Sequence, residues 1–260
     1  MRTFVIGDIH GNYKALVQVL ERSGFNYEED MLITLGDIVD GCQESFECVQ
    51  ELLKIRHRID IRGNHDATFY NWMKGEGNPF AWTQGGIHTA RSYAKGHGYD
   101  MHEEAYYQDN IFGEKEKRYN ISLHHASIDL RHFQFFHRQV KFYVDDKNRA
   151  FVHAGYTHPD GLGFEDESVY LWSRDLWQKN AMIPSQNTPK LLRPYSKIFI
   201  GHTQTLLWDE TKPMLRYNTW NLDTGAGHPD GKLTIMDLET EEYWQSDFTH
   251  ELYPDYKYEK

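Results

Sequence analysis

Near the N-terminus the chain reads Phe4-Val5-Ile6-Gly7-Asp8-Ile9-His10-Gly11, and this stretch decides the fold. Its apolar residues predict a short buried strand, and the glycine and polar residues that follow predict a loop at the strand's carboxyl end. A helix should come next, capped by Asn12 and ended by Gly24, with apolar residues at helical spacing: Ala15, Leu16, Val19 and Leu20. The N-terminal segment is therefore expected to form a strand–helix–strand unit with parallel strands.

The same ordering recurs along the chain. Apolar runs at 32–35, 59–61, 150–152 and 198–200 predict four further strands, and residues 44–54 predict a second helix. Each run is followed by a polar motif: Gly36-Asp37-Ile38-Val39-Asp40, Gly63-Asn64-His65-Asp66, His153-Ala154-Gly155 and Gly201-His202-Thr203. Open α/β sheets bind ligands at the carboxyl ends of their strands. We therefore expect these polar side chains to gather at one edge of the fold.

The rest of the chain does not follow this pattern of an apolar run and a polar motif. Residues 66–147 are rich in aromatic, glycine and histidine positions and predict a mainly helical insertion beside the site, within a single domain spanning residues 1–260. Runs at 220–222, 232–238 and 242–245, with a turn at 239–241, predict a mainly antiparallel C-terminal layer. Residues 254–260 are expected to be a loosely held end.

Composition narrows the class of protein. The formal net charge of −11 argues against a broad nucleic-acid-binding surface. Cys42 and Cys48 match neither a zinc spacing nor a secreted disulfide framework, which favours a reducing compartment. The residues before the first strand are too few for a signal peptide, and no apolar run approaches the roughly 18 residues of a membrane span. The expected location is the cytoplasm, without a membrane partner.

The polar residues of the motifs are of the kind that divalent metals prefer, carboxylate oxygen and imidazole nitrogen. Asp8 and His10 lie two residues apart just past a strand and can chelate one ion. Asp37 has two carboxylate oxygens and can bridge to a second ion. Further ligand atoms come from Asn64, His153 and His202. The sequence thus predicts two adjoining metal sites that share one carboxylate. Other histidines are expected to be surface or packing residues: His124, His125, His132, His137 and His158.

In this order the motifs resemble GDxHG, GDxVDRG, GNHE or GNHD, HAG and GHT, the signatures of the phosphoprotein phosphatase branch of the calcineurin-like metallophosphoesterases. Three later segments resemble its bacterial and phage members: Trp82-Thr83-Gln84-Gly85-Gly86, Leu171-Trp172-Ser173-Arg174-Asp175 and Leu222-Asp223-Thr224-Gly225-Ala226. The resemblance covers most of the chain. It implies an α+β/α/β fold in which a central two-sheet β-sandwich is flanked by helices, in four layers αββα.

The resemblance also implies a metal centre. Six positions match the metal ligands of the family: Asp8, His10, Asp37, Asn64, His153 and His202. Asp37 would bridge two divalent ions, for which Mn²⁺ is expected and iron or zinc are alternatives. Such a pair would hold a bridging hydroxide that attacks phosphorus in line.

His65 falls where the family has its general acid, and Asp40 where it has the carboxylate that orients this acid. Arg174 matches a phosphate-binding arginine of bacterial members. One position departs from the pattern, because the family usually has arginine where this chain has Gly41. Losing a phosphate-clamping arginine should weaken substrate binding or transition-state stabilisation. Arg91 from the insertion is one possible replacement.

Three functions follow from this pattern. The favoured one is a metal-dependent phosphomonoesterase acting as a serine/threonine protein phosphatase. The alternative is a nucleotide-directed hydrolase, such as a diadenosine tetraphosphatase or a nucleic-acid-end phosphatase, because Gly-Asn-His-Asp also resembles those members. Aromatic and basic residues of the insertion would then contact the nucleotide: Tyr106, Tyr107, Phe112, Lys115, Lys117 and Arg118. A low-activity metal- or phosphate-binding module is disfavoured, since ligation alone does not require His65 and Asp40.

Overall fold

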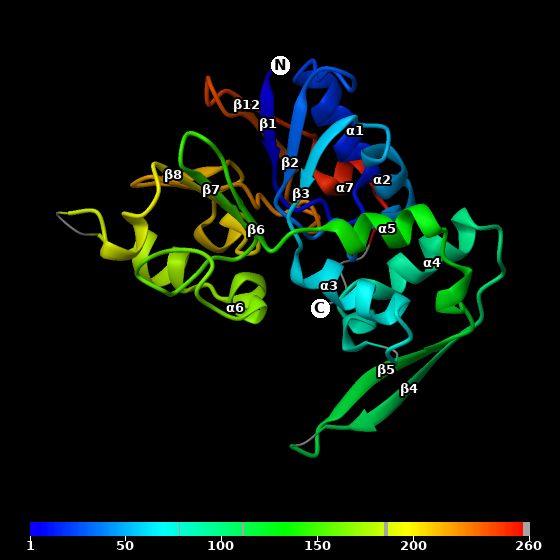
Figure 1. Ribbon diagram of the computed structural model, residues 1–260. Helices are drawn as coiled ribbons and strands as arrows, with labels where there is room; N and C mark the ends of the chain where they lie inside the picture. The colour runs from blue at the N-terminus through cyan, green and yellow to red at the C-terminus, as the bar shows by residue number, and fades with distance from the viewer. Residues whose placement is uncertain (78, 111, 185–186, 257–260) are drawn as a thin grey trace.

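In the computed structural model, which describes residues 1–77, 79–110, 112–184 and 187–256, two five-stranded sheets lie face to face (Figure 1). The first has the order β12-β11-β1-β2-β3 and contains β1 (Thr3–Ile6), β2 (Met31–Thr34), β3 (His57–Asp60), β11 (Thr234–Asp237) and β12 (Tyr243–Gln245). The second has the order β6-β7-β8-β10-β9 and contains β6 (Phe142–Val144), β7 (Arg149–Val152), β8 (Lys197–Ile200), β9 (Met214–Arg216) and β10 (Thr219–Asn221).

A shared apolar core joins the sheets. Val5 and Ile33 of the first sheet belong to the same buried cluster as Phe151 and Phe199 of the second, whose rings stack with centroids 5.0 Å apart. Burying an aliphatic or aromatic side chain of this size stabilises the fold by roughly 1.5–3 kcal/mol. This cluster is the centre of the sandwich.

Helices cover the outer faces of both sheets. The cluster outside the first sheet contains residues of α1 (Tyr13–Arg22), α2 (Ser45–Leu52), α3 (Asn64–Met73), α4 (Gly86–Gly96) and α5 (Leu130–Arg138). The cluster outside the second contains residues of α6 (Glu167–Trp172), the π-helix η3 (Asp175–Ala181) and the short η4 (Lys190–Leu192). Helix α7 (Thr249–Leu252) contacts α1. The predicted helix–sheet–sheet–helix order is therefore confirmed.

The N-terminal unit forms as its sequence predicts. The Asn12 side chain accepts a hydrogen bond from the Ala15 amide at 3.1 Å and caps α1. The apolar stripe of α1 is buried, and Gly24 takes a left-handed φ of +61° just after the helix. Strands β1, β2 and β3 pair in parallel. Their carboxyl ends consequently meet at one edge.

The C-terminal strands pair mainly antiparallel, as predicted, but they do not form a layer of their own. Strand β11 pairs with β1 and β12 in the first sheet, whereas β10 runs parallel to β8 in the second. The reason is core burial, because Met236 and Leu238 from one segment and Leu222 from the other belong to the inter-sheet cluster.

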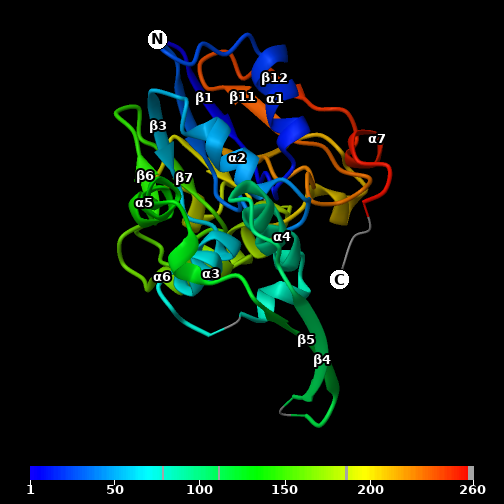
Figure 2. The same cartoon turned by 90° about the vertical axis from the view of Figure 1, so that its right-hand side faces the viewer.

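Residues 66–147 contain more than helices. Strands β4 (Glu103–Asp109) and β5 (Lys115–Ile121) pair as an antiparallel hairpin, which projects from the body of the molecule in both views (Figures 1 and 2). The sequence patterns did not predict it. Every residue of β4 is exposed, so the strand lacks the alternation of apolar and polar residues by which strands are predicted. Short helical turns complete this region and the chain: η1 (Phe80–Thr83), η2 (His125–Ser127) and η5 (Thr205–Trp208).

Candidate metal centre

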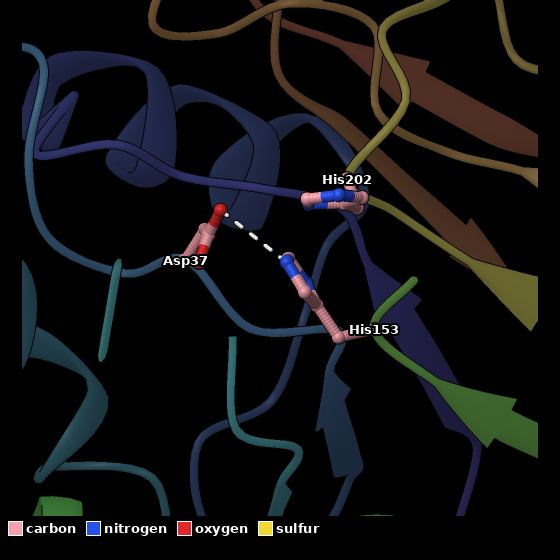
Figure 3. A group of neighbouring side chains, drawn as sticks. All are labelled: Asp37, His153 and His202. Atoms are coloured by element: carbon pink, nitrogen blue, oxygen red, sulfur yellow. Dashed lines mark ion pairs between the residues drawn. The ribbon is translucent and has the colours of Figure 1, made fainter. Parts of the chain in front are cut away.

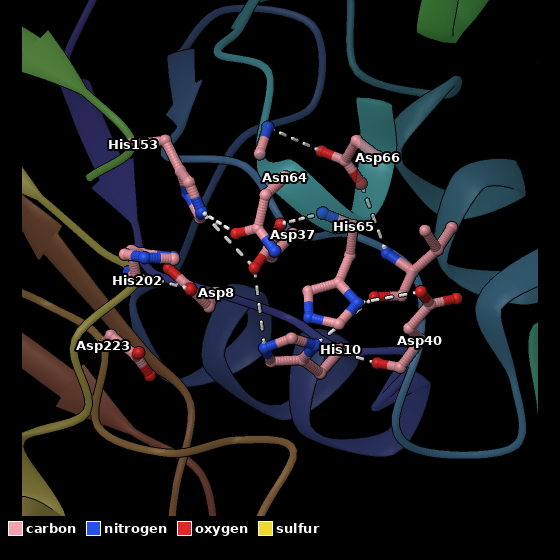
Figure 4. A network of polar contacts seen from close by, with 12 residues as sticks. Asp8, His10, Asp37, Asp40, Asn64, His65, Asp66, His153, His202 and Asp223 are labelled. Atoms are coloured by element: carbon pink, nitrogen blue, oxygen red, sulfur yellow. Dashed lines mark hydrogen bonds and ion pairs between the residues drawn. The ribbon is translucent and has the colours of Figure 1, made fainter. Parts of the chain in front are cut away.

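The predicted metal ligands lie together where strands of both sheets end (Figure 4). Asp8 and His10 follow β1, and Asp37 follows β2. Asn64 is the first residue of α3, directly after the β3 loop. The remaining two, His153 and His202, follow β7 and β8. The two parallel strand sets thus bring side chains more than 190 positions apart in the chain to one edge of the sandwich.

Two groups of metal-type atoms share one carboxylate. Ligand atoms of Asp8, His10 and Asp37 all lie within 4.8 Å of one another, and so do those of Asp37, His153 and His202 (Figure 3). The side-chain oxygen of Asn64 lies 3.0 Å from His153 Nε2, beside the second group. Asp37 is therefore the residue common to both groups.

The imidazole rings of His10 and His153 turn the same nitrogen toward Asp37. Each Nδ1 lies 2.8 Å from a backbone carbonyl oxygen, that of Asp40 and that of Leu35 respectively. A carbonyl only accepts hydrogen bonds, so Nδ1 donates. The Nε2 atoms lie 3.8 Å and 3.4 Å from Asp37 Oδ2. In the neutral tautomer these nitrogens present lone pairs to a carboxylate, an arrangement that a cation between them stabilises.

Two buried polar atoms of the centre have no hydrogen-bond partner among the described residues, Asp8 Oδ1 and His202 Nε2. The other oxygen of Asp8 accepts a hydrogen bond from the His202 amide at 3.0 Å. A buried acceptor without a partner costs about 1–3 kcal/mol. Divalent ions at the two groups would satisfy both atoms, so the residues present fit the metals that the motifs imply.

Carboxylates crowd this buried edge and perturb one another. Burial and the charges of Asp223 and Asp37 raise the pKa of Asp8 well above its usual range. Burial and the charge of Asp37 likewise raise the pKa of Asp66 to about 6. Burial opposes ionisation of Asp37 as well, yet His153 and His65 lower the pKa of its carboxyl. The centre thus concentrates negative charge that a cation neutralises.

The backbone is strained at four of the predicted site residues. Asp37, His10, His202 and Asp40 have φ values of +50°, +51°, +64° and +65°, in the left-handed region. Each such residue costs on the order of 1–3 kcal/mol and persists only where its surroundings impose it. Strain of this kind clusters at functional sites.

His65 and Asp40 form an ion pair beside the ligand groups (Figure 4). His65 Nδ1 lies 2.8 Å from Asp40 Oδ2, and the Thr89 hydroxyl donates to Asp40 Oδ1 at 2.8 Å. Although burial opposes its charge, the carboxylates of Asp37 and Asp40 raise the pKa of His65 to about 9. The ion pair with Asp40 favours the protonated imidazole, the form that a general acid requires.

A pocket of about 550 Å³ opens over these residues. Arg174 is exposed and lines its wall with Trp172. Arg91 lies elsewhere, because its guanidinium pairs with Glu103 and it lines a separate cavity of about 360 Å³. It does not replace the arginine that is missing at position 41.

The family follows from a comparison with known proteins. The family described as calcineurin-like phosphoesterase matches residues 1–206. The chain belongs to the calcineurin-like phosphoesterases. The chemistry of this family depends on divalent metal ions, and the residues gathered at this edge fit such ions. No helix among the described residues combines the length and apolar character that crossing a bilayer takes.

Two kinds of curated relative match this calcineurin-like phosphoesterase. A symmetrical bis(5'-nucleosyl)-tetraphosphatase from Buchnera aphidicola is 42% identical over 67 residues, 25% of this chain and 24% of that protein. Serine/threonine-protein phosphatase 2 from Salmonella typhimurium is 27% identical over 175 residues, 66% of this chain and 67% of that protein. The match therefore spans about a quarter of the length of the tetraphosphatase.

Solved structures share the fold. A protein serine/threonine phosphatase from Saccharomyces cerevisiae superposes with a TM-score of 0.56 at 14% identity, covering 95% of this chain and 80% of that one. A metallophosphoesterase from Sphaerobacter thermophilus gives 0.52 at 17% identity, covering 95% and 89%. Identities this low establish the calcineurin-like architecture alone.

Sequence reasoning assigned no role to Asp66. Its carboxylate accepts hydrogen bonds from the Ile38 amide at 2.8 Å and the Gly63 amide at 3.2 Å. It therefore ties together the loops that carry Asp37 and Asn64. The only signal in the sequence is its place at the end of the Gly-Asn-His-Asp motif.

The C-terminus also contributes to the pocket. Tyr256 lines it, is buried, and donates a hydrogen bond to the Gly227 carbonyl at 3.0 Å. The prediction of a loosely held end is therefore wrong for Tyr256, and residues 257–260 lie outside the described residues. The polar sequence of residues 254–260 carries no pattern that reveals such a contact.

Proposed function

We propose that this calcineurin-like phosphoesterase is a phosphomonoesterase that acts on phosphoserine and phosphothreonine in proteins. The charge of the pocket carries the proposal. Among the described residues that line it, Arg174 is the one lysine or arginine. A single guanidinium pairs with one phosphate group, whereas the phosphate chain of a dinucleoside polyphosphate requires several cations. The pocket is thus matched to a phosphomonoester.

The proposed metal ligands are those of the two groups with Asn64: Asp8, His10, Asp37, Asn64, His153 and His202. When bound, divalent ions there supply Lewis-acid polarisation of the phosphate and lower the pKa of water. Arg174 would bind phosphate oxygens at the pocket wall. His65, kept protonated by Asp40, would donate a proton to the leaving oxygen, a contribution of roughly 10²–10⁴-fold.

The acid pair weighs against a binding module without turnover. A site that only holds metal and phosphate gains nothing from a protonated imidazole next to the ligands. Here His65 is held at 2.8 Å by Asp40, which in turn is fixed by Thr89. Both contacts orient the ring for proton donation.

A nucleotide-directed activity is the second candidate. It is favoured by the 42% identity to a symmetrical bis(5'-nucleosyl)-tetraphosphatase over 67 residues. Against it stands the pocket lining, in which Arg174 is the one lysine or arginine among the described residues. The aromatic and basic residues of the β4–β5 hairpin do not line this pocket either, as far as the described residues show.

We propose Mn²⁺ as the metal, with iron and zinc as alternatives, and the cytoplasm as the location. Mixed oxygen and nitrogen ligands are compatible with all three metals. The two cysteines, Cys42 and Cys48, are free and buried, which agrees with a reducing compartment.

The test is a comparison of substrates by the Mn²⁺-loaded protein. We expect kcat/KM for a phosphoserine peptide to exceed that for diadenosine tetraphosphate by at least about tenfold, a difference of roughly 1.4 kcal/mol in transition-state binding. The reverse ranking would assign the site to dinucleoside polyphosphates. His65→Ala should lower kcat for both substrates and serves as the control for active-site hydrolysis.

A further inference from the structure

Two glycines meet at the position where the family arginine is missing. The Gly41 amide donates to the Gly85 carbonyl at 3.3 Å, and a Cβ on Gly85 would lie 2.5 Å from the Gly41 nitrogen. Their φ values are +109° and +86°, which side-chain-bearing residues rarely adopt. A Cβ on Gly41 would in addition lie 3.0 Å from the His10 side chain. An arginine at position 41 would therefore strain the backbone and press its Cβ against His10.

The segment that packs against Gly41 lies just before α4 and contains a polar residue. Gln84 precedes Gly85, is exposed, and lines the metal pocket together with His65 and Arg174. Its amide group offers two hydrogen-bond donors and one acceptor oxygen.

This segment is held firmly against the acid pair. Thr89, in the first turn of α4, donates to Asp40 Oδ1 at 2.8 Å and accepts from the Asp40 amide at 2.9 Å. With the Gly41–Gly85 contact, these bonds fix the start of α4 beside the loop that carries Asp37 and Asp40. Gln84 directly precedes this fixed segment, because the Gly85 and Thr89 contacts both lie on its C-terminal side.

We propose that Gln84 is a substrate-binding residue that replaces the missing arginine, with its amide donating to a phosphate oxygen. The inference rests on the proposed function of the pocket and deepens it. A neutral amide forms a weaker bond to phosphate than a bidentate guanidinium. Phosphate is then held by one guanidinium, that of Arg174, and one amide. Such a site binds a single phosphate group with moderate affinity and releases inorganic phosphate readily.

The probe is inorganic phosphate, titrated by calorimetry into the Mn²⁺-loaded protein so that binding is measured without turnover. We expect Gln84→Ala to raise the Kd for phosphate about tenfold, the size of one hydrogen bond to a charged group. Gln84→Glu should raise it further by repulsion, and Gln84→Arg should lower it below the wild-type value. Gln108→Ala, an exposed glutamine on β4, is the matched control and should bind like wild type.

Metal content and melting temperature are measured for each variant, so that a folding or metal defect is recognised. An unchanged Kd in Gln84→Ala with both metals present overturns the inference, and so does weaker phosphate binding by Gln84→Arg than by Gln84→Ala. These outcomes are separate from the proposed function. Preference for diadenosine tetraphosphate with an intact Gln84 effect refutes the protein-phosphatase proposal alone, and a phosphopeptide preference without that effect refutes Gln84 alone.

Discussion

Single residues of the centre divide into those that a local motif reveals and those that it does not. His153 stands directly after an apolar run, and Asp37 follows another after one glycine. The neighbouring residues therefore indicate that both lie at strand ends. Asp66 and Thr89 act through hydrogen bonds to loops 28 and 49 positions away. The packing of the insertion decides which loops these two residues contact. The spacing of neighbouring residues in the sequence does not encode that packing. The metal ligands themselves stay a prediction until ions are measured.

Asp66 provides a test at this scale. Asp66→Asn keeps one acceptor oxygen but turns an amide donor toward backbone N–H groups or Gln139. We expect the free energy of unfolding to fall by about 1–3 kcal/mol and metal affinity to fall with it. Urea unfolding and metal titration measure both, with the exposed Glu76→Gln as control. Stability equal to wild type would show that the Asp66 bonds do not support the loops.

Among the elements, the strands and helices around buried apolar stripes were predictable and the hairpin was not. Helix α1 has its cap, stripe and terminating glycine in one continuous segment. Strand β11 was found in the sequence but placed in the wrong layer, because its partner β1 is more than 200 residues away. The β4–β5 hairpin has little apolar surface to bury. Its sequence therefore lacks the alternation of apolar and polar residues that predicts strands.

The hairpin is expected to be dispensable for catalysis. Replacing residues 106–118 by Asn-Gly joins the paired positions Ala105 and Tyr119 through a two-residue turn. Because the removed residues do not line the pocket in the described part of the chain, kcat/KM for an aryl phosphate should stay within about twofold of wild type. A large loss for diadenosine tetraphosphate alone would instead give the hairpin a role in nucleotide binding.

Helix α5 makes stability depend on pH through His132, whose ring is fully buried. Its Nε2 accepts from the Gln50 amide at 2.8 Å and its Nδ1 donates to the Tyr93 hydroxyl at 2.9 Å, which requires the neutral ring. Burial lowers the pKa of His132 to about 4, below its ordinary value of 6.5. Between these values the unfolded chain binds more protons, so this contribution to stability is complete above pH 6.5 and is lost as pH falls toward 4.

The expected loss from His132 is about 3 kcal/mol between pH 7 and pH 4. Urea unfolding at both pH values measures it. His132→Gln should be less stable at pH 7 but should lose less stability on acidification than wild type, while the exposed His250→Gln should behave as wild type. Equal acid sensitivity in wild type and His132→Gln would mean that other groups control the pH dependence.

At the scale of the whole molecule, the sandwich makes the centre by placing two sets of parallel strand ends side by side. The fold was predictable because five motifs recur in a fixed order. The consequence of this design is that carboxylates, imidazoles and strained backbone are concentrated where the sheets meet. Metal binding should therefore stabilise the entire fold and not merely the loops that bear the ligands.

Removing the metals should lower the melting temperature. Ions that bind only the folded state at a free concentration about 1,000 times their Kd add about 4 kcal/mol to the free energy of unfolding. Thermal unfolding with chelator and with Mn²⁺ measures the difference, which should shrink in Asp37→Asn because both ligand groups contain this carboxylate. A melting temperature that changes with neither chelator nor Mn²⁺ would contradict stabilisation of the fold by metal binding.

The most direct test of the central claim is hydrolysis of a small aryl phosphate by metal-stripped protein titrated with Mn²⁺, in wild type and His65→Ala. We expect negligible turnover without metal, activity that reaches its plateau at two ions per chain, and a loss of roughly 10²–10⁴-fold in His65→Ala at unchanged metal content. Turnover without metal, or full activity in His65→Ala, would contradict a dinuclear phosphoesterase centre with His65 as its acid.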